Sequence, residues 1–269
     1  MPTLDALRSH LAGLGRVLLG YSGGVDSALL AVAGRQALGA DGILAVIGRS
    51  ASYPEVQWRT ARDIARRFDV PLLELETSEL ADPRYLANAP DRCYFCKSEL
   101  WTRLGDVAAS RGFDVVIDGT NADDRAGHRP GSRAAAERAV RSPLAELGWT
   151  KAEVRAAARE VGLPTWDAPA APCLSSRVQY GLAITPERLR QVEEGEAYLR
   201  ALGVTGDLRV RHHGETARLE VAPAHHAALR HRWGAVSDHF RRLGFGRVEL
   251  DPHGYRSGGL LTLLAEPER

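Results

Sequence analysis

The chain has 269 residues, of which 44% are hydrophobic and 26% charged. These are values of an ordinary globular protein, and they exclude a disordered, collagen-like or coiled-coil chain. Thirty-five basic and 34 acidic residues leave a net charge of +1, so we expect no nucleic acid as a partner. No run approaches the ~18 apolar residues of a membrane span. The first residues also lack the basic region of a signal peptide, and we therefore expect a cytoplasmic protein that makes no use of a membrane.

The first two thirds of the chain predict strands that alternate with helices. Apolar runs of strand length lie at 16–21, 42–47, 70–75 and 115–117, and helical patterns lie at 28–38, 54–68, 98–111 and 150–161. This alternation is typical of an α/β fold, a parallel sheet with helices on both faces. Ligands of such sheets bind at the carboxyl ends of the strands. The segments after residues 21, 48 and 117 are therefore expected to form one site.

The pattern changes after about residue 180. Helices are predicted over 185–202, with Thr185 as the cap, and over 224–233; short strands are predicted over 208–212, 217–221 and 247–250. We therefore expect two domains, residues 1–178 and residues 179–269, of which the second is a smaller α+β domain.

A glycine-rich segment lies between the first predicted strand and the first predicted helix. This glycine loop reads Ser22-Gly23-Gly24-Val25-Asp26-Ser27. The two glycines allow a tight turn that exposes backbone N–H groups to an anion, and the following helix adds its positive end. The two serine hydroxyls can donate to phosphate oxygens, and Asp26 is a candidate ligand for Mg²⁺ between loop and phosphate. The loop is neither a Walker loop nor a dinucleotide fingerprint.

The chain has three cysteines: Cys93 and Cys96 in a Cys-x-x-Cys pair, and Cys173 far along the chain. Two thiolates at this spacing can reach one metal or cluster. Three thiolates leave one position of a [4Fe–4S] cluster open, where an exogenous sulfide can bind. The alternatives are a redox-active dithiol, a structural zinc site or small buried hydrophobic residues.

Several motifs in this order resemble one family. The glycine loop is followed by Asp91-Arg92-Cys93-Tyr94-Phe95-Cys96-Lys97, Asp118-Gly119-Thr120-Asn121-Ala122-Asp123-Asp124, Arg129-Pro130-Gly131, Ser142-Pro143-Leu144, Lys151-Ala152-Glu153-Val154-Arg155, Cys173-Leu174-Ser175-Ser176-Arg177 and Leu208-Arg209-Val210-Arg211-His212. From about residue 5 to about residue 255 the chain resembles the LarE family, ATP-dependent sulfur transferases that help make the nickel-pincer cofactor of lactate racemase. The resemblance implies a PP-loop (adenine nucleotide α-hydrolase-like) fold for the first domain.

The resemblance also implies a reaction. ATP adenylylates a carboxylate of pyridinium-3,5-biscarboxylate mononucleotide, and a sulfur nucleophile then displaces AMP to leave a thiocarboxylate. One branch of the family takes the sulfur from a single cysteine, which Cys173 matches. The other branch has three cysteines and resembles enzymes that carry the sulfide on a [4Fe–4S] cluster, so we expect this route here, with Cys93, Cys96 and Cys173 as catalytic cluster ligands. Homo-oligomers, among them hexamers, are also implied.

Basic and acidic residues near the C-terminus complete the predicted site. Arg209 and Arg211 alternate on a predicted strand and so face one side of it, where two guanidinium groups suit the phosphate monoester of the nucleotide substrate; a solvated strand face is the other interpretation. The resemblance places Ser176 or Arg177 nearby, and it makes Glu196 and Glu220 candidates for a place near a metal or the substrate.

Other functions use the same kind of loop. A tRNA thiolase of the superfamily should carry a basic RNA-binding surface or an added module. A PP-loop ligase that uses ammonia has no role for the three cysteines together. A third alternative is a protein that only binds a nucleotide or a cluster.

Overall fold

The structure is a computed structural model that describes residues 2–125 and 130–256. Arg129 of the motif Arg129-Pro130-Gly131 lies outside the described residues. The chain folds as two compact units: unit 1 comprises residues 1–79 and 93–171, and unit 2 comprises residues 80–92 and 172–269. Among the described residues, no helix is long and apolar enough to cross a membrane.

Unit 1 is built on a parallel sheet of the strand order β3-β2-β1-β4. The strands are β1 (Val17–Gly20), β2 (Ile43–Arg49), β3 (Leu72–Glu76) and β4 (Val115–Ile117). The register pairs Leu18 with Leu44 on one side and with Val116 on the other. The predicted α/β fold with a parallel sheet is therefore confirmed.

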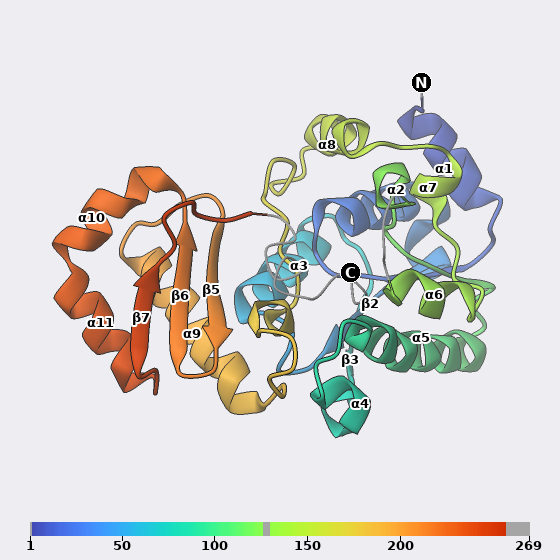
Figure 1. Ribbon diagram of the computed structural model, residues 1–269. Helices are drawn as coiled ribbons and strands as arrows, with labels where there is room; N and C mark the ends of the chain where they lie inside the picture. The colour runs from blue at the N-terminus through green and yellow to red at the C-terminus, as the bar shows by residue number, and fades with distance from the viewer. Residues whose placement is uncertain (1, 126–129, 257–269) are drawn as a thin grey trace. The chain divides into compact units, whose positions relative to one another are not determined.

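Helices cover both faces of this sheet (Figure 1). The helices of unit 1 are α1 (Leu4–Ala12), α2 (Val25–Gly42), α3 (Glu55–Arg67), α5 (Arg92–Arg111), α6 (Pro130–Ala136), α7 (Pro143–Glu146) and α8 (Lys151–Glu160). Alternate strand residues serve the two faces: Leu19 and Ile47 pack with α1, α2, α3 and α8, while Leu18 and Val46 pack with α5 and α6. Strands β1 and β4 and most of β2 are apolar because the sheet is buried on both sides there. The edge strand β3 is less buried and contains Glu74 and Glu76.

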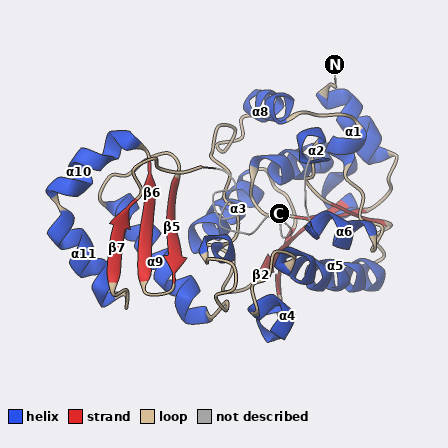
Figure 2. Cartoon of the chain, in the orientation of Figure 1, coloured by secondary structure: helices blue, strands red, loops and turns tan. Residues whose placement is uncertain are grey.

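Unit 2 contains a mixed sheet in which β5 (Leu208–His213) pairs antiparallel with β6 (Thr216–Val221), and β6 pairs parallel with β7 (Arg247–Leu250). Figure 2 shows the three strands side by side. One face of this sheet packs on α9 (Pro186–Ala201), α10 (His226–His231) and α11 (Trp233–Arg242). The predicted smaller α+β module is therefore present.

The boundary between the units differs from the predicted one at residue 178. Residues 80–92, which include α4 (Pro83–Leu86), belong with unit 2, and so does the chain from Pro172 onward. The reason is a set of buried polar contacts. The Tyr85 hydroxyl and the Ser175 hydroxyl lie 2.5 Å apart, and the amide Nδ2 of Asn88 donates to the carbonyls of Gln179 and Leu182 at 2.8 and 2.9 Å. These contacts fix a segment early in the chain to unit 2.

Two helices differ from their predicted ranges. Helix α5 begins at Arg92 rather than near residue 98, so both cysteines of the pair are helical. The helix predicted over 224–233 is divided, because α10 ends at His231 and α11 begins at Trp233, with Arg232 between them at φ −105° and ψ 17°.

Candidate functional site

The glycine loop connects β1 to α2 at the carboxyl end of the sheet. Gly23 has φ +69°, and a Cβ at this position would lie 2.6 Å from the Cβ of Ala61. Only glycine combines this backbone conformation with this close approach. The hydroxyls of Ser22 and Ser27 lie 3.2 Å apart, and the Ser27 hydroxyl donates to the carbonyl of Gly24 at 3.1 Å. The loop therefore holds its two hydroxyls together at the start of α2.

This position is the switch point of the sheet. The chain runs from β1 to β2 and β3 on one side and then returns to β4 on the other side of β1. In open α/β sheets, ligands bind in the crevice at this point. The segment after β4 touches the glycine loop, because a Cβ on Gly119 would lie 2.9 Å from the Ser27 nitrogen. The structure thus brings together the loops after residues 21 and 117, as the sequence predicts.

Asp26 contacts two side chains that the sequence reasoning did not assign to the site. Its Oδ1 accepts a hydrogen bond from Nδ2 of Asn121 at 3.0 Å, and its Oδ2 forms an ion pair with the ammonium of Lys151. Asp26 was predicted as a candidate magnesium ligand, and that role stays a prediction. The sequence does contain one indication that Lys151 is special: only Lys97 and Lys151 among the 35 basic residues are lysines.

The segment after β2 supports the backbone of the glycine loop. The Tyr53 hydroxyl and the Gln57 Nε2 donate to the carbonyl of Ser22, at 2.8 and 2.7 Å. Burial raises the pKa of Tyr53 far above its usual range, so the hydroxyl stays protonated and donates at any physiological pH. These two donors fix the point where the loop leaves β1.

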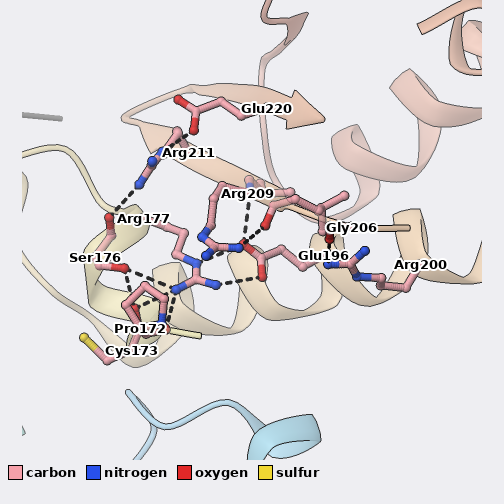
Figure 3. A network of polar contacts seen from close by, with 12 residues as sticks. Pro172, Cys173, Ser176, Arg177, Glu196, Arg200, Gly206, Arg209, Arg211 and Glu220 are labelled. Carbon is pink, nitrogen blue, oxygen red and sulfur yellow. Dashed lines mark hydrogen bonds and ion pairs between the residues drawn. The ribbon is translucent and has the colours of Figure 1, made fainter. Parts of the chain in front are cut away.

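In unit 2, Cys173 lies just before a short 3₁₀ turn, Leu174–Arg177. The Cys173 carbonyl accepts from the backbone N–H and the hydroxyl of Ser176, at 3.0 and 2.7 Å, and from Nη1 of Arg177 at 3.0 Å. Arg177 also donates to the Pro172 carbonyl. Figure 3 shows the Cys173 sulfur pointing away from these contacts. The backbone around Cys173 is thus fixed by hydrogen bonds, while its thiol points away from the groups that make them (Figure 3).

Arg177 is anchored in turn by Glu196 of α9. Its Nε and Nη2 donate to the two carboxylate oxygens at 2.9 and 3.1 Å, and Glu196 Oε1 also accepts from the Val210 nitrogen at 3.1 Å. Arg177 is only 3% exposed. A bidentate pair of this kind fixes both partners. The pair accounts for the Glu196 carboxylate within the fold, and the predicted role of Glu196 near a metal stays a prediction.

Arg209 and Arg211 share one side of β5, as their alternation predicts. Both guanidinium carbons lie over the Tyr255 ring, 4.6 and 5.9 Å from its centroid. Arg211 donates to Glu220 at 2.8 Å and to the Ser176 carbonyl at 2.9 Å. Both arginines are buried, so the alternative of a solvated strand face is wrong. Figure 3 shows this arginine network, Arg177, Glu196, Arg209, Arg211 and Glu220.

The electrostatics of the arginine network favour an anion. Burial and the nearby charge of Arg177 lower the pKa of Arg209, and burial raises the pKa of Glu220 despite its bond to Arg211. Both shifts express the cost of charges held away from water. A phosphate that accepted from Arg209 would offset part of that cost.

The cysteine pair lies on the first turns of α5, in unit 1. Cys93 is exposed and Cys96 is partly buried. Residues three apart on a helix lie on the same face, so the spacing fits two ligands of one metal cluster. Cys173 belongs to unit 2. Across residues 2–125 and 130–256, the structure contains no group of three or more His, Cys, Asp or Glu side chains placed to hold a metal ion.

The fold, the switch point and the glycine loop define an ATP-using enzyme of the PP-loop class. The family model of NAD synthase matches residues 4–88, which cover the glycine loop and the first three strands. The chain is also similar to a glutamine-dependent NAD(+) synthetase of Rhodobacter capsulatus, at 41% identity over 80 residues, which are 30% of this chain and 14% of that protein. Both matches cover only part of the chain.

Other relatives match the whole chain. An uncharacterized protein of Synechocystis is 42% identical over 98% of both chains. The pyridinium-3,5-bisthiocarboxylic acid mononucleotide synthase of Lactiplantibacillus plantarum is 34% identical over 97% of this chain and 95% of its own. The chain belongs to this second protein's family, LarE, and is an ATP-dependent sulfur-transferring enzyme. The resemblance seen in the motifs is thereby confirmed.

Proposed function

We propose that this enzyme converts the carboxylates of pyridinium-3,5-biscarboxylate mononucleotide into thiocarboxylates, for the nickel-pincer cofactor of lactate racemase. The observation that carries the proposal is the full-length similarity to the synthase of Lactiplantibacillus plantarum. It covers 97% of this chain and so extends past residue 88, where the match to NAD synthase ends, over the segments that contain the cysteines and the arginine network.

The first step takes place at the glycine loop. A carboxylate oxygen of the substrate attacks the α-phosphorus of ATP, the bond between the α- and β-phosphates breaks, and pyrophosphate leaves. The hydroxyls of Ser22 and Ser27 and the N–H groups around Gly23 and Gly24 bind the departing phosphates. Asp26 is the candidate ligand for the Mg²⁺ that accompanies ATP. The acyl carbon then carries AMP, a far better leaving group than oxide.

The second step transfers sulfur. A sulfur nucleophile attacks the acyl carbon, the bond to the AMP oxygen breaks, and the thiocarboxylate remains. We assign Arg209 and Arg211, with Ser176 and Arg177 beside them, to the phosphate of the substrate. These guanidinium groups are buried near one another, and a phosphate that accepted from them would offset part of the cost of burying their charges. Repetition of both steps on the second carboxylate gives the bisthiocarboxylate.

For the source of sulfur we propose the cluster route. Cys93 and Cys96, on one face of α5, and Cys173, on the held turn of unit 2, would be the ligands. When bound, a [4Fe–4S] cluster with three protein ligands supplies an iron that can carry an added sulfide. Arg177 and Ser176 fix the backbone on which the Cys173 thiol is presented. A cysteine that gave up its own sulfur would end the enzyme after one transfer, whereas a cluster allows turnover.

The reaction is tested with anaerobically prepared protein, Mg·ATP, sulfide and the biscarboxylate nucleotide. We expect release of AMP and pyrophosphate, and a product in which sulfur replaces a carboxylate oxygen. The Cys93→Ser/Cys96→Ser/Cys173→Ser variant should lose sulfur transfer. An ammonia-using ligase would keep its activity in that variant and form an amide, and this result would contradict the proposal. Retention of tRNA on a filter would favour a thiolase instead.

The sulfur source has its own test. Iron and acid-labile sulfide should be present in the anaerobic protein, with a broad visible absorption that dithionite bleaches. If both are absent and the protein loses the mass of one H₂S at Cys173 after reaction, the cysteine itself is the donor. We also propose that the chain forms a homo-oligomer, to be measured by light scattering.

A further inference from the structure

Lys151 is an unusual choice of residue for its position. It is one of two lysines in a chain with 35 basic residues, so arginine is the usual cation of this protein. It is also the first residue of α8, directly after the N-cap Thr150. A positive charge at a helix N-terminus is opposed by the helix dipole. The stability of α8 therefore does not explain a cation at this position, nor why the cation is a lysine and not an arginine.

The contacts of Lys151 explain where its charge is needed. Its ammonium pairs with the carboxylate of Asp26, in the first turn of α2. Its backbone N–H donates to Asp123 Oδ2 at 2.8 Å, and the capping box of Thr150 and Glu153 fixes the same turn. The backbone is held by three groups, whereas the side chain is 38% exposed. The ammonium can thus turn to a new partner without movement of the helix.

Asp26 alone would repel the ligand of the glycine loop. Its carboxylate belongs to the glycine loop, to which we assign the phosphates of ATP. Two negative charges close to each other repel. The Lys151 ammonium neutralises this carboxylate. An ammonium has three donors on one point charge, so it can donate to Asp26 and to a phosphate oxygen at the same time. The planar guanidinium of arginine would direct its two parallel N–H donors at the carboxylate and leave fewer donors for a phosphate.

We propose that Lys151 is a binding residue for the departing β- and γ-phosphates of ATP, and that Asp26 holds its ammonium at the glycine loop until they arrive. The proposal rests on the use of ATP by this enzyme. It adds a residue from the second half of unit 1, outside the region that matches NAD synthase, and it places α8 at the nucleotide.

The composition of the chain makes a direct test possible. Because the protein has only two lysines, acetylation followed by peptide mass spectrometry follows Lys97 and Lys151 one by one in the unmodified full chain. The arms are no ligand, ATP, pyrophosphate and AMP, with binding of each measured separately by equilibrium dialysis. With ligand at ten times its dissociation constant, ATP and pyrophosphate should slow labelling of Lys151 about tenfold. AMP should change it less than about twofold.

A pair of variants gives an independent measurement. Lys151→Met should weaken pyrophosphate binding roughly 10- to 100-fold, the effect of one hydrogen bond to a charged group. Arg159→Met removes the same charge from the other end of α8, where Arg159 lies over Trp166, and should leave the affinity within about twofold. Lys151→Arg keeps the charge and should recover only part of the loss.

The outcomes separate this inference from the proposed function. Bound ATP that leaves Lys151 as reactive as before, or equal protection by AMP, would overturn the role of Lys151 while ATP use stands. Failure of the wild-type protein to bind ATP at all would instead remove the basis of both. Should Lys151→Met fail to fold, labelling of the wild-type chain still decides the question.

Discussion

Unit 1 and unit 2 each gather groups that can bind a phosphate, but they do so in different ways. The glycine loop of unit 1 uses the backbone N–H groups and hydroxyls of six consecutive residues, and its two hydroxyls bond to each other and to the loop backbone. The arginine network of unit 2 joins a turn, a helix and two strands through buried ion pairs. Removal of one partner of a buried pair leaves the other charge uncompensated. We infer that unit 2 depends on its site for stability far more than unit 1 does.

The largest effect is expected for Arg177→Ala. This change leaves the Glu196 carboxylate without its bidentate partner and removes the donor to the carbonyls of Pro172 and Cys173. The free energy of unfolding should fall by about 3–5 kcal/mol, as measured by chemical denaturation. Arg190→Ala on α9, the helix that carries Glu196, breaks the exposed pair with Glu194 and should cost less than about 1 kcal/mol. Equal costs for the two variants would contradict the comparison of the units.

Gly23→Ala tests the loop of unit 1. The new Cβ would meet Ala61 at 2.6 Å in a backbone at φ +69°, and strain with overpacking should cost about 3 kcal/mol. Gly24→Ala is the matched control, since φ is −67° and the nearest atom to a Cβ is the Ser22 hydroxyl at 3.4 Å. Thermal unfolding with and without ATP measures both. If Gly24→Ala were as destabilised as Gly23→Ala, the close approach to Ala61 would not be the cause.

Acid should affect unit 2 first. Burial, with a smaller effect of Arg188, lowers the pKa of His212 from its usual value of 6.5 to about 4. Between about pH 6.5 and pH 4, His212 is therefore protonated in the unfolded chain and neutral in the folded chain. The stability from neutral His212 is complete above pH 6.5 and is lost as the pH falls through about 4, a loss of about 2–3 kcal/mol. His212→Asn should flatten this part of the pH dependence, although His213 and His239 have lowered pKa values too.

The corresponding group of unit 1 titrates in a more acidic range. Hydrogen bonds from Arg141 lower the pKa of Glu146 to about 2, so its contribution is present above pH 4.5 and is lost as the pH falls toward 2. The indole signals of Trp233, in unit 2, and Trp149, in unit 1, report each unit separately. We expect Trp233 to change at the higher pH. Simultaneous loss of both signals would contradict separate acid responses.

The smallest effect concerns a helix cap in unit 1. Thr150→Ala removes the hydroxyl that accepts from the Glu153 N–H and donates to the Glu153 carboxylate, but keeps the backbone N–H that donates to the same carboxylate. The change should cost about 1 kcal/mol. Thr150→Ser keeps the hydroxyl and should cost a few tenths. A cost for Thr150→Ala near that of Arg177→Ala would mean that local caps stabilise the protein as much as buried pairs do.

The same contrast explains what the sequence could predict. The glycine loop and the cap at Thr150 are local signals, and α8 begins at Lys151 as expected. Helix α5 begins earlier than predicted, because its first residue Arg92 is buried against Asn88 and Tyr180. The contact with Tyr180 comes from a distant part of the chain, so no local pattern reveals it. Cysteine and aromatic residues are also only modest helix formers.

The predicted site follows the same rule. The alternation of Arg209 and Arg211 correctly places both on one side of β5. Glu196, the partner of Arg177, lies 19 residues away along the chain, and Lys151 lies 125 residues from its partner Asp26. Such pairs depend on the tertiary fold, and a single sequence contains no pattern that links them.

The attachment of residues 80–92 to unit 2 has a consequence for biosynthesis. These residues leave the ribosome long before their partners around Ser175 and Gln179 are translated. Tyr85 and Asn88 therefore lack these partners in the nascent chain until the segment from Ser175 to Leu182 has been synthesised. A truncated gene that encodes only the second half would lack them permanently and would leave a polar gap in the interior of its product.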